Sequence, residues 1–312
     1  MKSSKTKKKL AFKVTFLISV CVATIVLLSF FLPKNPNSYL HGFKQKDNLL
    51  KQTHSPKIIL VGDSNMAFGI DSAALKREYG ENVVNTGLHG GLGMDFPLNW
   101  TGRYISNGDT VLVSFAYPIF FGKSSHGDET VSALLLEEPR AWKYLDCGSA
   151  RTLFSGLGNV CGDRILDCLH RHPHFSSNEI YNAQAFNEFG DVVSQAGKSP
   201  HQIPPTMPEK ELSADAFNRL AAFVTGAEAR GAKVCIIPPP YRADMFDATR
   251  DQVREAWTEM QKRFPKEAVG EPSNFVYEAS FFFDTEYHLN GSGRKMRTHQ
   301  IVNVLGHGIA KN

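Results

Sequence analysis

The sequence has no internal repeat and, beyond its first 13 residues, no excess of charge of either sign. Six of its 35 Lys and Arg residues lie in that first segment, where there is no acid, which leaves 29 basic against 31 acidic residues from Val14 onward. The formal charge of +4 therefore does not predict a nucleic-acid partner, because the clustered lysines flank an apolar segment and no recognition motif follows them. With 42% apolar and 21% charged residues, the composition also excludes a disordered or collagen-like chain.

Cysteine is scarce, with five residues in 312. Cys21 and Cys235 lie in apolar segments, where a thiol behaves as a small core residue. The other three lie between residues 120 and 210, and Cys161 could form one disulfide, with either Cys168 or Cys147. Cys168 and the alternating histidines at residues 170–174 match no standard zinc spacing, so we expect no metal and no cofactor.

An uninterrupted apolar run, VTFLISVCVATIVLLSFFL, occupies residues 14–32. As an α-helix it would span about 28 Å, close to the hydrocarbon core of a bilayer. A secretory signal peptide has a shorter apolar stretch and a small-x-small cleavage site, which is absent from the bulky end of this run. We therefore expect a cytoplasmic tail at residues 1–13, a retained single-pass anchor in the cytoplasmic membrane, and a periplasmic or extracellular domain, following the positive-inside rule.

Beyond the anchor the pattern alternates between strands and helices. Residues 33–55 are polar and aperiodic, and we expect them to be a spacer. Alternation over residues 56–312 predicts a three-layer α/β/α domain with a parallel sheet, of the flavodoxin-like kind. Residues 120–210 interrupt it, as an insertion that forms a cap or lid would. The predicted strands are residues 57–61, 82–85, 110–115, 233–237 and 275–277, and the predicted helices are residues 71–79, 211–230, 247–264 and 293–305.

Two segments have residues suited to nucleophilic catalysis. Ser64 follows the first predicted strand directly, which is where an α/β protein displays a nucleophile, although Gly-Asp-Ser is also common turn sequence. Near the C-terminus, Asp284 precedes His288 by four residues, just before the last predicted helix. A serine hydroxyl needs a base and an acid that orients the base, and this loop could supply both. Glu286 is the alternative orienting acid.

These segments resemble the SGNH (GDSL-like) hydrolase family. Its first block is matched by Gly62-Asp63-Ser64, with Gly69-Ile70-Asp71 following, and its second block by the sequence NTGLHGG at residues 85–91. Its last block, Asp-x-x-His, is matched by Asp284 and His288 with one extra residue between them. The third block, Gly-x-Asn-Asp, is absent, and residues 113–118 read VSFAYP instead. The resemblance covers most of residues 57–120 and 211–305.

The resemblance implies an SGNH hydrolase fold and a Ser64–His288–Asp284 triad. It also implies an oxyanion hole built from the amides of Ser64 and of Gly87 or Gly91, with Asn65 as a weaker candidate. More narrowly, the anchor and the His-Leu-Asn ending are similar to membrane-anchored SGNH proteins of cell-envelope acylation, such as the D-alanine-transfer and alginate O-acetylation proteins.

A protein of that type is an esterase or O-acyltransferase that acts on acyl esters of a cell-envelope or exported polysaccharide. A membrane-bound O-acyltransferase is an expected partner. The alternative is a catalytically inactive glycan-binding or scaffold subunit, which the missing third block and the stretched Asp–His spacing favour.

Overall fold

The computed structural model describes residues 2–32, 34–169, 179–198, 201, 203–205, 207–209 and 211–306. Its centre is a four-stranded sheet, all of whose strands are parallel, in the order β2-β1-β3-β4. The strands are β1 (Lys57–Gly62), β2 (Asn82–Asn85), β3 (Thr110–Ser114) and β4 (Lys233–Ile236). The predicted α/β class and parallel sheet are confirmed.

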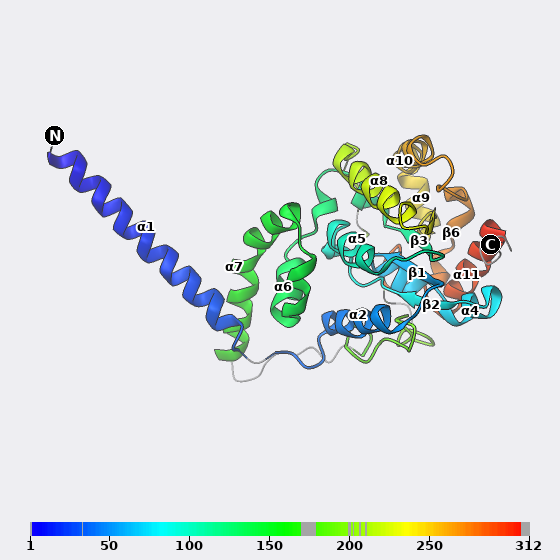
Figure 1. Ribbon diagram of the computed structural model, residues 1–312, viewed down its shortest axis with the longest axis horizontal. Coiled ribbons are helices and arrows are strands. Elements are labelled where there is room, and N and C mark those ends of the chain that lie inside the picture. The colour runs from blue at the N-terminus through cyan, green and yellow to red at the C-terminus, as the bar shows by residue number, and fades with distance from the viewer. Residues whose placement is uncertain are drawn as a thin grey trace.

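Helices cover both faces of this sheet (Figure 1). Ile59 and Val61 of β1 belong to one apolar core and Ile58 and Leu60 to the other, since successive side chains of a strand point to opposite faces. On the first face lie α2 (Gly42–Gln52), α5 (Asp95–Thr101), α8 (Ala214–Glu228) and α10 (Arg250–Arg263), and on the second lie α4 (Ser72–Tyr79) and α11 (Gly291–Leu305).

The last predicted strand, residues 275–277, does not join the central sheet. Its residues form a short strand, β6 (Val276–Tyr277), that pairs in parallel with β5 (Tyr241–Arg242). β5 itself follows three successive prolines at 238–240, which have no N–H to donate to a strand ladder, so β4 ends before them. The pair β5–β6 precedes the loop with Asp284 and His288.

The prediction of a spacer at residues 33–55 is wrong for residues 42–52, which form α2. Phe43 and Leu50 of this helix are buried in the core, and so are the polar Lys46 and Asp47. Lys46 Nζ donates to Asn85 O at 2.9 Å, and Trp100 Nε1 donates to Asp47 at 3.0 Å. The buried face of α2 therefore carries charged residues, which made the segment look solvated in the sequence.

Residues 120–210, the predicted insertion, include α6 (Thr130–Glu137), α7 (Cys147–Leu169) and an irregular segment at residues 179–198. Neither predicted disulfide forms, because Cys161 and Cys168 are free thiols. All three cysteines lie on α7, where a spacing of seven or more residues separates them by about 10 Å or more along the axis, too far for a disulfide. The histidine-rich residues 170–174 lie outside the described residues.

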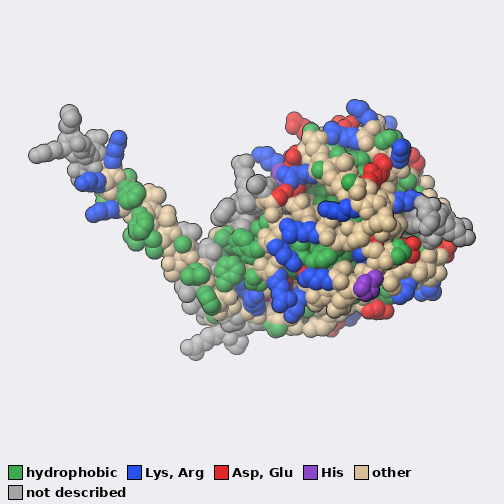
Figure 2. Space-filling model, viewed as in Figure 1, with side chains coloured by type: hydrophobic (Ala, Val, Ile, Leu, Met, Phe, Trp, Pro, Cys, Tyr) green, Lys and Arg blue, Asp and Glu red, His purple; other side chains and the backbone are tan. Residues whose placement is uncertain are grey.

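A long helix, α1 (Lys2–Ser29), extends from the domain beside α7, and α9 (Ala243–Ala248) links β5 to α10 (Figure 1). Phe12, Phe16 and Leu17 of α1 are exposed, and lysines gather at its free end (Figure 2). Among the helices built from described residues, none combines the length and the hydropathy needed to cross a membrane.

Candidate active site

Ser64 lies at the carboxyl end of β1, as the first residue of the short helix α3 (Ser64–Gly69). Asp63 caps this helix: its Oδ1 accepts the Asn65 amide at 2.8 Å, while its Oδ2 accepts the Ala116 amide at 2.8 Å. Only glycine fits at position 62, because a Cβ there would collide with the carbonyl of Ser114 on β3. The turn is therefore tied to the ends of two strands, and it leaves Ser64 partly exposed.

The loop before α11 brings a histidine and an acid to Ser64. His288 Nε2 lies 2.7 Å from Ser64 Oγ, and His288 Nδ1 lies 2.8 Å from Asp284 Oδ1. Thr285 shapes the turn between them, since its hydroxyl accepts the His288 amide at 3.0 Å. The ring of Phe68 stacks on the imidazole, with centroids 4.2 Å apart and planes inclined by 8°. The structure thus brings Ser64, His288 and Asp284 into one hydrogen-bonded chain.

Glu286, the alternative orienting acid, is placed elsewhere. It is buried, and its backbone carbonyl accepts the Arg242 amide at 3.2 Å. The acid that contacts the His288 ring is Asp284.

The environment of Asp284 keeps it ionised. Burial on its own raises the pKa of this carboxyl, but hydrogen bonds from His288, Tyr181 and the Thr285 amide outweigh burial, and the pKa lies below its ordinary value. An ionised Asp284 holds the proton of His288 on Nδ1, which leaves Nε2 free to accept the proton of Ser64.

Tyr181 was not among the predicted site residues. Its hydroxyl donates to Asp284 Oδ2 and lies 3.0 Å from His288 Nδ1. Burial, followed by the charge of Asp284, raises the pKa of Tyr181, so the phenol remains a neutral donor. Its ring packs between Phe68 and Tyr39, at centroid distances of 5.5 and 5.6 Å. Tyr181 lies in the aperiodic inserted region, where nothing in the sequence marks it.

Arg297 of α11 supports the turn that displays Ser64. It is fully buried, and its guanidinium donates to Asn65 O at 2.8 Å, Asn65 Oδ1 at 3.0 Å and Ser114 Oγ at 3.1 Å. Burial lowers the pKa of Arg297 to about 10, so it is still a cation at neutral pH. One sequence signal could have revealed it: Gly293, Arg297 and Ile301 recur every four residues along the buried face of the helix.

Three of the predicted oxyanion donors are already used within the protein. The Gly87 amide donates to Asn85 Oδ1 at 3.0 Å, and the Gly91 amide donates to His89 Nδ1 at 3.0 Å. The Asn65 side chain is buried and donates to Asp63 Oδ1 at 2.7 Å and Ser114 O at 3.0 Å. The amide of Ser64 differs from these, because the first residue of a helix has no intrahelical acceptor.

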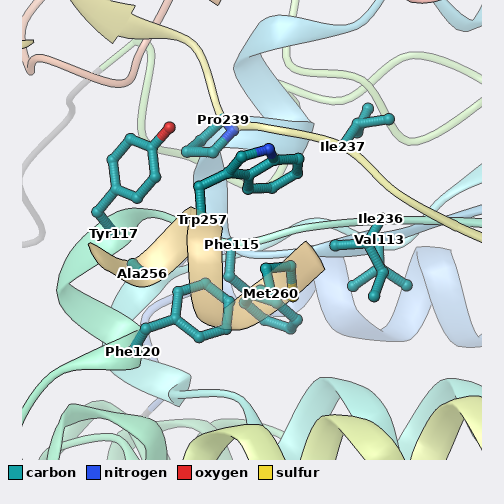
Figure 3. Close-up of a pocket in the computed structure, with 10 residues that line it drawn as sticks. All are labelled: Val113, Phe115, Tyr117, Phe120, Ile236, Ile237, Pro239, Ala256, Trp257 and Met260. Atoms are coloured by element: carbon teal, nitrogen blue, oxygen red, sulfur yellow. The ribbon is translucent and has the colours of Figure 1, made fainter. Parts of the chain in front are cut away.

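A cleft of about 480 Å³ is lined in part by Tyr181, whose hydroxyl contacts Asp284 and His288. Tyr39 and His89 also line it, together with Asp163 of α7 and with Glu129, which directly precedes α6. Figure 3 shows a different space, apolar and only about 10 Å³ in volume, lined mainly by residues of β3, β4 and α10 and of the segments that follow the two strands. A space that admits about one water molecule belongs to the core, whereas the cleft beside Tyr181 is large enough to hold a small ligand.

Among the residues that the structure describes, no three His, Cys, Asp or Glu side chains are grouped to hold a metal ion. Comparison of the sequence with protein-family models and with curated proteins finds no match to this chain.

Proposed function

We propose that this protein is a serine esterase or O-acyltransferase of the SGNH (GDSL-like) type, acting on acyl esters of a cell-envelope or exported polysaccharide. The observation that carries the proposal is the chain of hydrogen bonds from Ser64 Oγ to His288 Nε2 at 2.7 Å and from His288 Nδ1 to Asp284 at 2.8 Å. A serine at the end of the first strand, a histidine that can take its proton and a buried carboxylate that orients the histidine are the parts that acyl transfer needs.

The reaction proceeds in two balanced steps. His288 takes the proton of Ser64 as its oxygen attacks the ester carbonyl, and the tetrahedral intermediate releases an alcohol that receives this proton from His288. An acyl-Ser64 ester remains. In the second step His288 takes a proton from the acceptor hydroxyl, the acceptor attacks the acyl group, and Ser64 regains its proton from His288. Water as acceptor yields an acid, and a sugar hydroxyl yields a new ester.

The strand order β2-β1-β3-β4 with helices on both faces supports the flavodoxin-like, three-layer part of the proposal. Ligands in such sheets bind outside the carboxyl ends of the strands, and Ser64 follows β1 at that edge. The cleft of about 480 Å³ that Tyr181 and His89 line has room for a sugar unit.

We further propose that residues 14–32 anchor the domain outside the cytoplasmic membrane, near a membrane-bound O-acyltransferase and the polymer that it modifies. Support comes from the apolar sequence of this segment, from the exposed Phe16 and Leu17 of α1, and from the lysines before it. Alkaline carbonate should leave the full-length chain in the membrane fraction, and a periplasm-active reporter fused after Asn312 should be active. An extractable chain or an inactive reporter contradicts the anchor.

A catalytically inactive glycan-binding or scaffold subunit is the second candidate, and one observation favours it. The amides of Gly87 and Gly91, which the family resemblance assigns to the oxyanion hole, both donate within the protein. A scaffold would need neither a free oxyanion donor nor a reactive serine.

A fluorophosphonate probe separates the two candidates, because it labels only a serine that a neighbouring base activates. Full-length wild-type protein in detergent should be labelled, and Ser64→Ala should not. Ser292→Ala is the matched control, since Ser292 is an exposed serine at the start of α11, and it should be labelled as the wild type is. Wild-type protein that is folded but unlabelled would refute the enzyme and leave the scaffold.

A further inference from the structure

His89 is a polar residue close enough to His288 and to Asp63, the neighbour of Ser64, for both to influence its pKa, and the mechanism so far gives it no role. It follows β2, and the Thr86 amide donates to Leu60 O at 2.9 Å, which holds this segment against the end of β1. Gly87 then lies against the start of α3, where a Cβ would come within 2.6 Å of Asp63 O. Two residues later, His89 lines the same cleft as Tyr181.

The hydrogen bonding of His89 fixes which nitrogen carries its proton. Nδ1 accepts the Gly91 amide at 3.0 Å, so Nδ1 has no proton and Nε2 has one. Burial, together with the nearby His288, lowers the pKa of His89 despite the opposing charges of Asp128 and Asp63, so the ring is neutral at pH 7. Within the described part of the chain, Nε2 has no hydrogen-bond acceptor, and its N–H is free to donate into the cleft.

An acyl-transfer site needs donors aimed at the oxygen that becomes negative in the tetrahedral intermediate. The amides of Gly87 and Gly91 and the side chain of Asn65 are engaged elsewhere, which leaves the Ser64 amide from the predicted set. No third-block asparagine is present in the sequence to supply a side-chain donor.

We propose that His89 Nε2–H is the second oxyanion donor of this site, acting with the Ser64 amide. The inference rests on the proposed serine acyl transfer. A neutral imidazole suits the task, because it donates a hydrogen bond to the developing oxyanion without giving up its proton, and His288 alone exchanges protons with the reactants.

The proposal also explains why a glycine stands at position 91. A Cβ there would collide with the side-chain oxygens of Asp128 and Thr130, so glycine lets the backbone turn back to His89 without displacing these side chains. The Gly91 amide then acts on the reaction through His89: it fixes the tautomer that presents Nε2–H to the cleft.

Two substitutions test the role of His89 in p-nitrophenyl acetate hydrolysis by the full-length protein. His89→Ala removes the donor and should lower kcat about 10²- to 10³-fold while KM changes little, as for other oxyanion donors. His89→Gln keeps a side-chain N–H of similar reach and should recover part of this loss. If His89→Ala turns over at the wild-type rate, or if only KM changes in both variants, the proposal is overturned.

A spectroscopic measurement gives a second test that does not depend on turnover. The phosphonyl oxygen of the Ser64 fluorophosphonate adduct stands where the oxyanion forms. In nitrogen-15 spectra of the wild type, the His89 Nε2–H signal should move downfield and become protected from exchange when the adduct forms. An unchanged His89 signal refutes the oxyanion role even if His89→Ala folds poorly. Failure of the probe to label Ser64 would instead refute the proposed enzyme itself.

Discussion

Replacing Tyr181 by phenylalanine removes one hydroxyl that holds the orienting acid of the site. This hydroxyl donates to Asp284 Oδ2, while Asp284 Oδ1 receives the His288 ring and the Thr285 amide. A hydrogen bond to a buried charge is worth about 1.5–3 kcal/mol, and about 1.4 kcal/mol corresponds to a factor of ten in rate. Because His288 and Thr285 still hold the carboxylate in Tyr181→Phe, we expect kcat for p-nitrophenyl acetate to fall about tenfold with little change in KM.

The same substitution should alter the pH dependence of stability. The pKa of Asp284 is lowered in the folded protein, so its contribution is present above the pKa of the unfolded chain, about 3.9, and is lost as the pH falls through the folded value. Tyr181 is one of the groups that lower this pKa. Urea unfolding at pH 7 should therefore show a loss of about 1.5–3 kcal/mol in the free energy of unfolding, and the loss should shrink below about pH 4 as Asp284 becomes protonated.

Tyr144→Phe is a matched control for both measurements. Tyr144 also donates to a buried carboxylate, Asp47 Oδ1, at 2.7 Å, but this pair lies between α2 and the inserted region and has no contact with Ser64. Its loss should destabilise the protein to a similar degree and leave kcat unchanged. If Tyr144→Phe and Tyr181→Phe lose activity equally, or if the instability of Tyr181→Phe is the same at pH 7 and pH 3, the role assigned to Tyr181 is refuted.

Two further substitutions test how the nucleophile is positioned. Gly87→Ala places a Cβ 2.6 Å from Asp63 O and 2.7 Å from Ala67 N. It should therefore lower the free energy of unfolding in urea by about 1–3 kcal/mol and slow fluorophosphonate labelling. Gly90→Ala is the control: its Cβ would meet no atom within 4 Å, so neither quantity should change. Equal effects of the two alanines would contradict this. Arg297→Lys keeps the cation but cannot reach three oxygens at once. It should therefore lower the free energy of unfolding by about 2–3 kcal/mol and slow labelling. A variant within about 0.5 kcal/mol of the wild type would show that the contacts of the guanidinium are unimportant.

The central sheet could be predicted from the sequence because its strands are buried on both faces. Residues 58–61 and 111–113 are therefore continuous apolar runs within the predicted strands. The helix α2 could not be predicted in the same way, since its buried face includes Lys46 and Asp47. Their burial is stabilised by partners far along the chain, such as Asn85 O, that a local pattern does not reveal.

The residues of the site also differ in whether the local sequence could predict them. Ser64 could be predicted because it directly follows a strand, and His288 and Asp284 because both stand in one short loop, whose extra residue the Thr285 hydroxyl accommodates. Tyr181 reaches Asp284 from 103 positions away, through a segment with no periodic pattern. Its place depends on the packing of its ring against Phe68, which only the folded chain determines.

The glycine-rich segment after β2 shows why a motif can locate a site without assigning the atoms that act there. Gly87 and Gly91 stand where the family resemblance predicts oxyanion amides, yet each amide donates to a side chain of its own segment, Asn85 or His89. What a backbone N–H contributes depends on which acceptor lies nearest to it, and the sequence names the glycine but not the acceptor. The Gly91 amide donates to an imidazole nitrogen, His89 Nδ1. This hydrogen bond leaves the proton of the ring on Nε2, so the proposed oxyanion donor is His89 Nε2–H rather than the Gly91 amide.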